Sequence, residues 1–285
     1  MIINEKKIAK PFLKWAGGKT QLLASIEKSL PVNVKKSQFT YIEPFVGSGA
    51  VLFWLINKYP NLEKAIINDI NSDLTNSYKT IKYNVEELIP ILKKWEKEYH
   101  NISINQESKK EYYYSKRKLF NTRKCNNTKQ AALFIFLNRT CFNGLYRVNS
   151  KNEFNVPIGS YKTPMICDED NLLNVSEALK KVEIINGDFE KTINYTSYNT
   201  FFYFDSPYKP LSETSSFNSY AKDKFNDDEQ IRLKEFCEVL DNKNYQWILS
   251  NSDVKGKNPK NNFFDDLYKK YNIVRVMSRK NKILN

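Results

Sequence analysis

The chain has 285 residues, of which 41% are hydrophobic, so it can bury a sizeable core and is not expected to be disordered. Its 45 Lys and Arg against 32 Asp and Glu give a net charge of +13, which favours a polyanionic partner such as nucleic acid, although a Lys-rich proteome would give the same excess. Its single histidine, His100, argues against histidine-based triads and two-histidine metal sites, and we predict no metal.

Compartment and redox state follow from equally simple features. No secretory leader and no apolar run of the roughly 18 to 20 residues needed to cross a bilayer are recognisable, so we expect a cytoplasmic protein without membrane contact. The four cysteines are far apart and form no CxxC pair, which favours reduced thiols over a disulfide framework or a zinc site.

The first part of the chain has an α/β pattern. Apolar spacing predicts a helix over 19–30, which Pro31 closes. A strand over 39–44, a glycine loop, a helix over 50–59 and a second strand over 64–69 follow. This order of strand, glycine loop, helix, strand and terminal acid is typical of one half of a doubly wound fold.

The middle of the chain is more polar and aromatic. Helices are predicted over 84–99, 107–121 and 128–138, and we interpret 73–167 as an inserted helical unit. The segment 143–161 closes it and is punctuated by Gly, Asn and Pro. It is expected to be a loop or hairpin with basic residues, whose alternative is a solvated basic loop without function.

The α/β pattern then resumes. Strands are predicted over 182–186, 200–204 and 245–250, with an amphipathic helix over 227–240 between the last two. The predicted fold is therefore α/β, a doubly wound Rossmann-like sheet interrupted by a helical insertion. The sheet domain would comprise residues 1–72 and 168–285.

The run Gly17-Gly18-Lys19-Thr20 suggests a phosphate-binding loop, but the spacing argues against one. Such a loop needs a glycine five positions before Gly18, where Leu13 stands, and a preceding strand. What remains is a flexible glycine pair beside Lys19 at a helix start, which can hold a carboxylate as easily as a phosphate.

A second glycine motif, Gly47-Ser48-Gly49, lies between a predicted strand and helix, where a ligand can approach the backbone. Asp69 follows Gly49 by 20 residues, at the end of the next strand. A carboxylate there is placed to accept the ribose hydroxyls of an adenosine-type cofactor. A structural tight turn with a capping aspartate is the alternative.

The third motif, Tyr203-Phe204-Asp205-Ser206-Pro207-Tyr208, ends the strand 200–204 at the ligand-binding edge of an open α/β sheet. The Asp205 carboxylate and the Ser206 carbonyl can each accept one N–H of an exocyclic amino group. This frees the nitrogen lone pair for in-line attack, while Tyr208 stacks on the base. An ordinary Asp-Ser-Pro turn is the alternative.

Together these stretches resemble the DNA adenine-N6 methyltransferases of the Dam and DpnII type, in their alpha arrangement. The resemblance is carried in order by PFLKWAGGK, YIEPFVGSGAV, INDIN, FLNRTCFNGLYRVNSKNEFNVPIGSY, INGDF and YFDSPY followed by KPLS. It departs at Ser206, where the family usually has proline; serine keeps the carbonyl but relaxes the loop.

The resemblance implies S-adenosyl-L-methionine as cofactor and assigns residues to it. Its methionine end would meet Trp15, Gly17 and Lys19, with Lys19 near the cofactor's carboxylate or the catalytic loop. Its backbone side would meet Phe45, Gly47 and Gly49. Asp69 would bind the ribose, and Asp188 and Phe189 the adenine. The catalytic set, which also reaches the cofactor through Asp205, is Asp205, Ser206, Pro207 and Tyr208.

The same resemblance implies that the inserted unit is a target-recognition domain for double-stranded DNA. Its expected DNA contacts are Lys14, Arg139, Phe142, Asn143, Leu145 and Arg147. Phe142 would wedge beside the displaced base, and Arg147 would read a guanine edge. The site would be GATC-like, the protein a monomer, and a cognate restriction endonuclease a possible partner.

The predicted reaction is direct transfer of a methyl group to adenine N6 in a base rotated out of the duplex. Two alternatives stay open at this point. One is methylation of an amino or amide nitrogen in RNA or protein, because similar loops serve those substrates, although the basic hairpin argues against it. The other is a non-catalytic DNA-binding relative, suggested by Ser206 and by the carboxyl end VRVMSRKNKILN, which lacks the longer basic and acidic hairpin common in the family.

Overall fold

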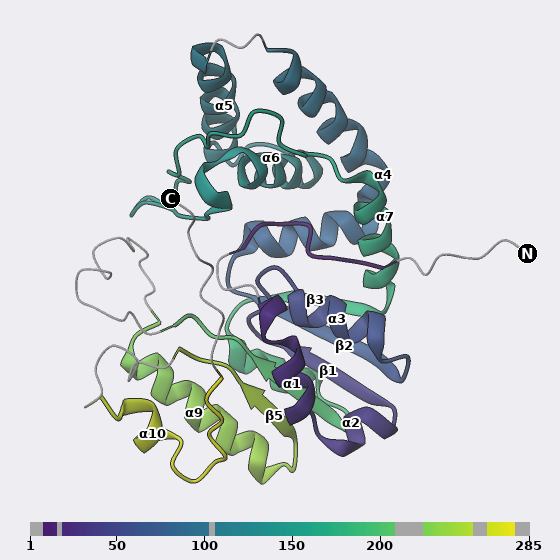
Figure 1. Cartoon of the computed structure of the whole chain (residues 1–285), viewed down its shortest axis with the longest axis vertical. Coiled ribbons are helices and arrows are strands. Elements are labelled where there is room, and N and C mark those ends of the chain that lie inside the picture. Colours follow the sequence, from purple (N-terminus) through teal and green to yellow (C-terminus); the bar gives the residue numbers. More distant parts are fainter. Residues whose placement is uncertain (1–7, 16–18, 103–105, 209–224, 253–260, 277–285) are drawn as a thin grey trace, which may run out of the picture.

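The computed structural model describes residues 8–15, 19–102, 106–208, 225–252 and 261–276. Its centre is an all-parallel sheet of five strands in the order β3-β2-β1-β4-β5 (Figure 1). The strands are β1 Phe39–Glu43, β2 Leu62–Asp69, β3 Val182–Asn186, β4 Thr200–Phe204 and β5 Gln246–Leu249. The predicted doubly wound α/β fold is confirmed.

The apolar sequences of the central strands reflect burial on both sheet faces. Every residue of β1 and β4 is buried, as expected for strands that carry helices on both sides. Alternate side chains enter different cores: Phe202 and Phe204 pack against α9 (Asp227–Asn242), and Tyr203 against the opposite face.

The strand order creates a switch point between β1 and β4. The chain winds outward from β1 through β2 to β3 on one side, and from β4 to β5 on the other. The register pairs Thr40 with Thr200 and Ile42 with Phe202, so the carboxyl ends of these strands emerge side by side. Ligands bind in the crevice that such a divergence leaves.

Some of the helices that lie between β1 and β3 in the chain cover one face of the sheet. They are α3 (Ala50–Lys58), the first half of α4 (Ser72–Asn101) and α7 (Glu169–Ala178). The sequence interpretation missed both α7 and the first half of α4. Buried residues at helical spacing are nonetheless present in both, Leu74, Tyr78 and Ile81 in α4 and Leu172 and Val175 in α7.

The second half of α4, with α5 (Gln106–Asn121) and α6 (Asn127–Thr140), forms the helical part predicted in the middle of the chain (Figure 1). The two halves of α4 meet at Asn84, whose φ and ψ are not helical. Helix α6 contacts both neighbouring helices and is buried over most of its length. This burial on all sides explains the apolar run ALFIFL in α6.

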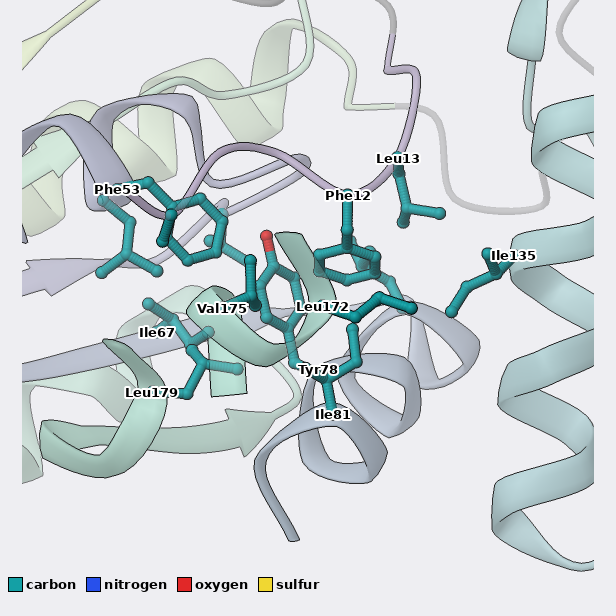
Figure 2. Packing of buried hydrophobic residues seen from close by; sticks show 14 of the residues in the cluster. Phe12, Leu13, Phe53, Ile67, Tyr78, Ile81, Ile135, Leu172, Val175 and Leu179 are labelled. Atoms are coloured by element: carbon teal, nitrogen blue, oxygen red, sulfur yellow. The ribbon is translucent and has the colours of Figure 1, made fainter. Parts of the chain in front are cut away.

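One hydrophobic core connects the sheet to these helices. Figure 2 shows Phe12 and Tyr78 beside each other, with Leu13 and Ile135 of α6 at the edge of the same cluster. The Phe12 and Tyr78 rings meet edge to face, with centroids 5.0 Å apart. Helix α4 begins at Ser72 and therefore runs across the predicted domain boundary at 72/73. That boundary stays a prediction.

The remaining elements are short. Helices α1 (Leu23–Ser29) and α2 (Val32–Lys36) precede β1, and α10 (Phe263–Leu267) follows β5. Antiparallel bridges between Cys141 and Ile158 and between Val148 and Phe154 make the predicted hairpin. None of the helices in the described ranges has the length and apolar character needed to cross a membrane.

We predict that Gly49→Ala destabilises the protein. Gly49 has φ +71°, and a Cβ atom there would lie 2.6 Å from the Tyr78 hydroxyl, so strain and close contact add. The expected loss of unfolding free energy is about 1 to 3 kcal/mol. It is measured by chemical denaturation, with Ser48→Ala in the same loop as the control that should change little. Equal stability of the Gly49→Ala variant and the wild type would contradict this expectation.

Candidate active site

A cavity of about 1000 Å³ opens at the switch point, above the carboxyl ends of the strands. Eleven residues predicted for cofactor binding or catalysis line it: Trp15, Lys19, Phe45, Gly47, Asp69, Asp188, Phe189, Asp205, Ser206, Pro207 and Tyr208. Gly49 does not line the cavity, because it lies behind Gly47 at the start of α3. Gly17 falls outside the described residues.

Lys19 lines the cavity and is only 4% exposed. Its Nζ is 2.7 Å from Asp205 Oδ1 and also donates a hydrogen bond to the Tyr208 hydroxyl. Burial would lower the pKa of Lys19, but the Asp205 charge and these hydrogen bonds outweigh burial and raise it. Lys19 therefore holds the Asp-Ser-Pro-Tyr loop by its two ends.

Asp205 is partly buried at the end of β4. Burial raises the pKa of its carboxyl, and the neighbouring ammonium of Lys19 opposes that rise. The ion pair thus favours the carboxylate, which can accept hydrogen bonds but cannot donate them. Ser206 beside it is almost fully buried, and its Oγ has no hydrogen-bond partner among the described residues.

The glycine loop between β1 and α3 brings backbone close to the cavity. Gly47 has φ +48°, and a Cβ atom there would lie 2.9 Å from Trp15 Nε1. The Tyr78 hydroxyl donates to the Gly47 carbonyl at 3.0 Å. Only glycine satisfies both the backbone angle and the close approach of Trp15, so the loop can present its peptide groups to a ligand.

Asp69 connects the end of β2 to this loop. Its Oδ2 accepts a hydrogen bond from Gly47 N at 3.2 Å, and its Oδ1 accepts one from Asn71 N at 2.9 Å. Burial raises the pKa of Asp69 to about 6, although these hydrogen bonds oppose the change. Asp69 therefore orients the glycine loop as well as facing the cavity.

An aromatic wall, formed by Phe45, Phe189 and Phe225, and an ion pair line another side of the cavity. The rings of Phe45 and Phe189 are 5.4 Å apart, and Phe225 meets Phe45 edge to face at 5.5 Å. Asp188 Oδ2 accepts from Arg232 Nη2 at 2.6 Å, and the Arg232 guanidinium lies 4.4 Å from the Phe189 ring centre. This side offers a flat apolar surface beside a carboxylate.

The cavity is acidic although the protein as a whole is basic. Its lining contains six carboxylic acids and two bases, namely Glu43, Asp69, Asp188, Asp205, Asp228 and Glu229 against Lys19 and Arg232. Burial raises the pKa of Glu43 well above its usual value, which favours the neutral form of this acid. The remaining excess of carboxylates favours a ligand that carries positive charge.

Several cavity residues were missed from the sequence. Glu43 could have been found, because it lies near the end of the predicted strand, just before Pro44. Phe225 lies just before α9 and Arg232 lies within its first half, and no local pattern marks them as ligand-facing. They reach the site only because α9 packs beside the end of β4.

The residues predicted to contact DNA lie mainly in the hairpin after α6. Phe142 and Leu145 are 51% and 39% exposed, which is unusual for large apolar side chains and suits a surface that meets a partner. Arg147 Nε donates to Asn155 Oδ1 at 2.7 Å across the hairpin. Asn143 adopts φ +53° between these residues.

Two of the predicted DNA contacts anchor the hairpin to the rest of the molecule. Arg139 Nη2 donates to the Phe12 carbonyl at 2.8 Å, and burial lowers the pKa of its guanidinium. The Lys14 backbone N–H donates to Asn138 Oδ1 at 2.8 Å, while its Nζ lies 3.8 Å from the Tyr161 ring centre. These contacts give both residues a structural role.

The hairpin also contacts the lining of the cavity, through Trp15. The rings of Trp15 and Tyr146 stack with centroids 6.0 Å apart, and Tyr146 donates to Asp73 Oδ2 at 3.3 Å. Asp73 in turn forms an ion pair with Arg123. The cavity and the expected DNA surface are thus neighbours.

Comparison with known proteins identifies the family. The model for D12 class N6 adenine-specific DNA methyltransferases matches residues 15–281. The type II methyltransferase M.MjaIII of Methanocaldococcus jannaschii is 52% identical over 274 residues, 95% of this chain and 92% of the relative. The chain belongs to the D12 class of N6 adenine-specific DNA methyltransferases. The resemblance inferred from the motifs is confirmed.

Other relatives are also named methyltransferases or methylases. The type II methyltransferase M1.LlaDCHI of Lactococcus lactis is 39% identical and covers 96% of this chain and 90% of the relative. The DNA adenine methylase of Haemophilus influenzae is 37% identical and covers 86% and 80%. Membership makes this methyltransferase an adenine-specific enzyme that acts on DNA.

The raised pKa of Asp69 predicts a pH-dependent stability difference. Its folded-state pKa of about 6 exceeds the ordinary 3.8, so ionising it destabilises the folded state as pH rises from 4 to 7. Relative to Asp69→Asn, the wild type should lose up to about 3 kcal/mol of unfolding free energy over this range. Urea titrations of both proteins at each pH measure the difference. A constant or growing advantage of the wild type would contradict the expectation.

Proposed function

We propose that the methyl donor is S-adenosyl-L-methionine, bound in the cavity at the switch point. When bound, this cofactor supplies a methyl group on a positively charged sulfur. The acidic cavity suits its charge, and 1000 Å³ is large enough for a molecule of its size. The buried Oδ1 of Asn68 and Oγ of Ser206 have no hydrogen-bond partner among the described residues. They give the cavity further groups that can bond to the cofactor.

We assign the cavity residues to parts of the cofactor. Asp69 accepts the ribose hydroxyls, and the aromatic wall of Phe45 and Phe189 packs on the adenine, beside the Asp188 carboxylate. Trp15, Gly47 and Lys19 surround the methionine end, together with Gly17. Gly49 serves this site indirectly, by allowing the turn into α3.

Asp205 and the Ser206 carbonyl carry the proposed chemistry. Each accepts one N–H of the adenine N6 amino group, so the nitrogen lone pair turns toward the methyl group and attacks in line. Lys19 holds Asp205 as a carboxylate for this task. Tyr208, which is partly exposed at the mouth of the cavity, stacks on the base. The bond between N6 and the methyl group would form as the bond between methyl and sulfur breaks, which leaves a neutral thioether. The nitrogen would then give one proton to water, without a covalent enzyme intermediate.

The adenine must leave the duplex to reach Asp205, because N6 is inaccessible to this chemistry inside a stacked helix. We propose that Phe142 enters the space beside the displaced base and that Arg147 reads a guanine edge in the major groove. Leu145, Asn143, Lys14 and Arg139 support this surface. The recognised site is proposed to be GATC-like.

We propose a monomer on double-stranded DNA, with a cognate restriction endonuclease as a possible partner. Support for the partner comes from two relatives named type II methyltransferases. Digestion of DNA from cells that express the protein, using endonucleases blocked by adenine methylation at defined sites, tests the GATC-like assignment. Cleavage of every GATC site in that DNA would reject it.

Loss of Asp205 should abolish methyl transfer. We expect Asp205→Ala to lower the rate at least about 100-fold, because one acceptor for the amino group is removed. Asp205→Asn keeps the shape if the unpaired buried Lys19 prevents Asp205→Ala from folding, and it too should be strongly impaired. Transfer of labelled methyl groups to duplex DNA measures the rate, with the exposed Asp170→Ala as control. Full activity of either Asp205 variant would refute the assignment.

Loss of Arg147 should relax sequence discrimination. Arg147→Ala is expected to reduce the preference for the cognate base by about 1 to 3 kcal/mol, since a bidentate contact to guanine is lost. Rates on a set of duplexes with single base changes measure this. Lys151→Ala, at the exposed tip of the same hairpin, should weaken binding to all duplexes equally. An unchanged preference in Arg147→Ala would remove Arg147 from base recognition.

A further inference from the structure

The Asp-Ser-Pro-Tyr loop has a second support in addition to Lys19. Gln230 of α9 is fully buried, and its Nε2 donates to the Pro207 carbonyl at 3.1 Å. Asn251, just beyond β5, donates through Nδ2 to Gln230 Oε1 at 3.1 Å. Gln230 itself does not line the cavity but lies behind the loop.

These hydrogen bonds fix the amide of Gln230 in one orientation. A backbone carbonyl only accepts hydrogen bonds, so the group that faces Pro207 must be the NH₂ of Gln230. Its Oε1 then faces Asn251, which supplies the donor that this oxygen needs. Both ends of the buried Gln230 amide are therefore hydrogen-bonded. Turning the amide over would place its oxygen against the Pro207 carbonyl and its NH₂ against the NH₂ of Asn251.

The contact limits how the catalytic carbonyl can move. The hydrogen bond holds the peptide between Pro207 and Tyr208, and the proline ring fixes φ of Pro207. Only ψ of Pro207 then remains between this peptide and the Ser206 carbonyl. Because serine at 206 has no ring to restrict its own φ, the external support matters more in this chain than it would with proline there.

We propose that Gln230 is a positioning residue, which holds the Pro207 carbonyl so that Asp205 and the Ser206 carbonyl keep the spacing needed to accept the two N–H groups of adenine. The inference rests on the catalytic role proposed for this loop. It also assigns α9 two tasks, since Arg232 on the same helix holds Asp188 at the other side of the cavity.

The test separates turnover from binding. Gln230→Leu should lower kcat about 10- to 100-fold, because a misplaced acceptor acts on the transition state, while the dissociation constants for S-adenosyl-L-methionine and duplex DNA change less than about threefold. In Gln230→Glu the carboxylate cannot donate to Pro207 at high pH, whereas its protonated form can. Its kcat deficit relative to wild type should therefore shrink between pH 8.5 and pH 6.

A matched control is available in Gln130 of α6. It is also a buried glutamine whose Nε2 donates to a backbone carbonyl, that of Phe120 at 3.1 Å, but it lies outside the cavity. Gln130→Glu should lower the melting temperature without a pH-dependent change in kcat. If Gln230→Leu does not fold, Gln230→Glu decides the question by its pH profile.

Each result has a distinct meaning. Wild-type kcat in a folded Gln230→Leu, or a pH-independent deficit in Gln230→Glu equal to that of Gln130→Glu, overturns the positioning role. If Asp205→Ala remains inactive in the same experiment, the proposed function stands while this inference fails. Activity of Asp205→Ala would instead reject the catalytic assignment on which the inference rests.

Discussion

The parallel pairing of β1 with β4 is the constraint on which the site depends. Because the register aligns Ile42 with Phe202, the strands end together, and the glycine loop and the Asp-Ser-Pro-Tyr loop emerge beside each other. After β1 the chain continues to β2 on one side, and after β4 it continues to β5 on the other side. Within the described residues, no connecting segment therefore fills the space between the two loops, and a cavity forms there. A register shift at this one pair would separate the glycine loop from the Asp-Ser-Pro-Tyr loop.

The distribution of charge divides the protein into two surfaces with different tasks. A net charge of +13 suits a DNA-modifying enzyme, whose first requirement is to approach phosphates. Inside the cavity the balance is reversed, and the buried Lys19 is paired with Asp205 rather than offered to a phosphate. The Gly-Gly-Lys-Thr run thus resembles a nucleotide loop in composition, while its lysine supports a carboxylate. Basic charge outside and acidic charge inside favour a polyanion and a cationic ligand respectively.

Local sequence patterns predicted a large part of the fold, and they failed where tertiary contacts decide. Strands 182–186 and 200–204 were predicted at their observed bounds, because apolar runs bounded by polar residues are typical of buried parallel strands. The first half of α4 was missed, since its few apolar residues are separated by polar ones and only the surrounding core makes them buried. The kink at Asn84 also divides the helix. For α7, a capping aspartate, Asp168, was a usable signal that the interpretation did not weigh.

The sequence by itself determined the family, because the glycine loop, the terminal acid and the Asp-Ser-Pro-Tyr motif are each contiguous and encode their own local geometry. Only the tertiary structure decided what surrounds them. Gln230 and Arg232 reach the site from α9, Phe225 from just before it, and Asn251 from beyond β5, through packing between segments distant in the chain. The partner of Lys19 was likewise not fixed by its motif. A side chain's hydrogen-bond partner depends on which strand lies next to it, and strand order is a property of the whole fold.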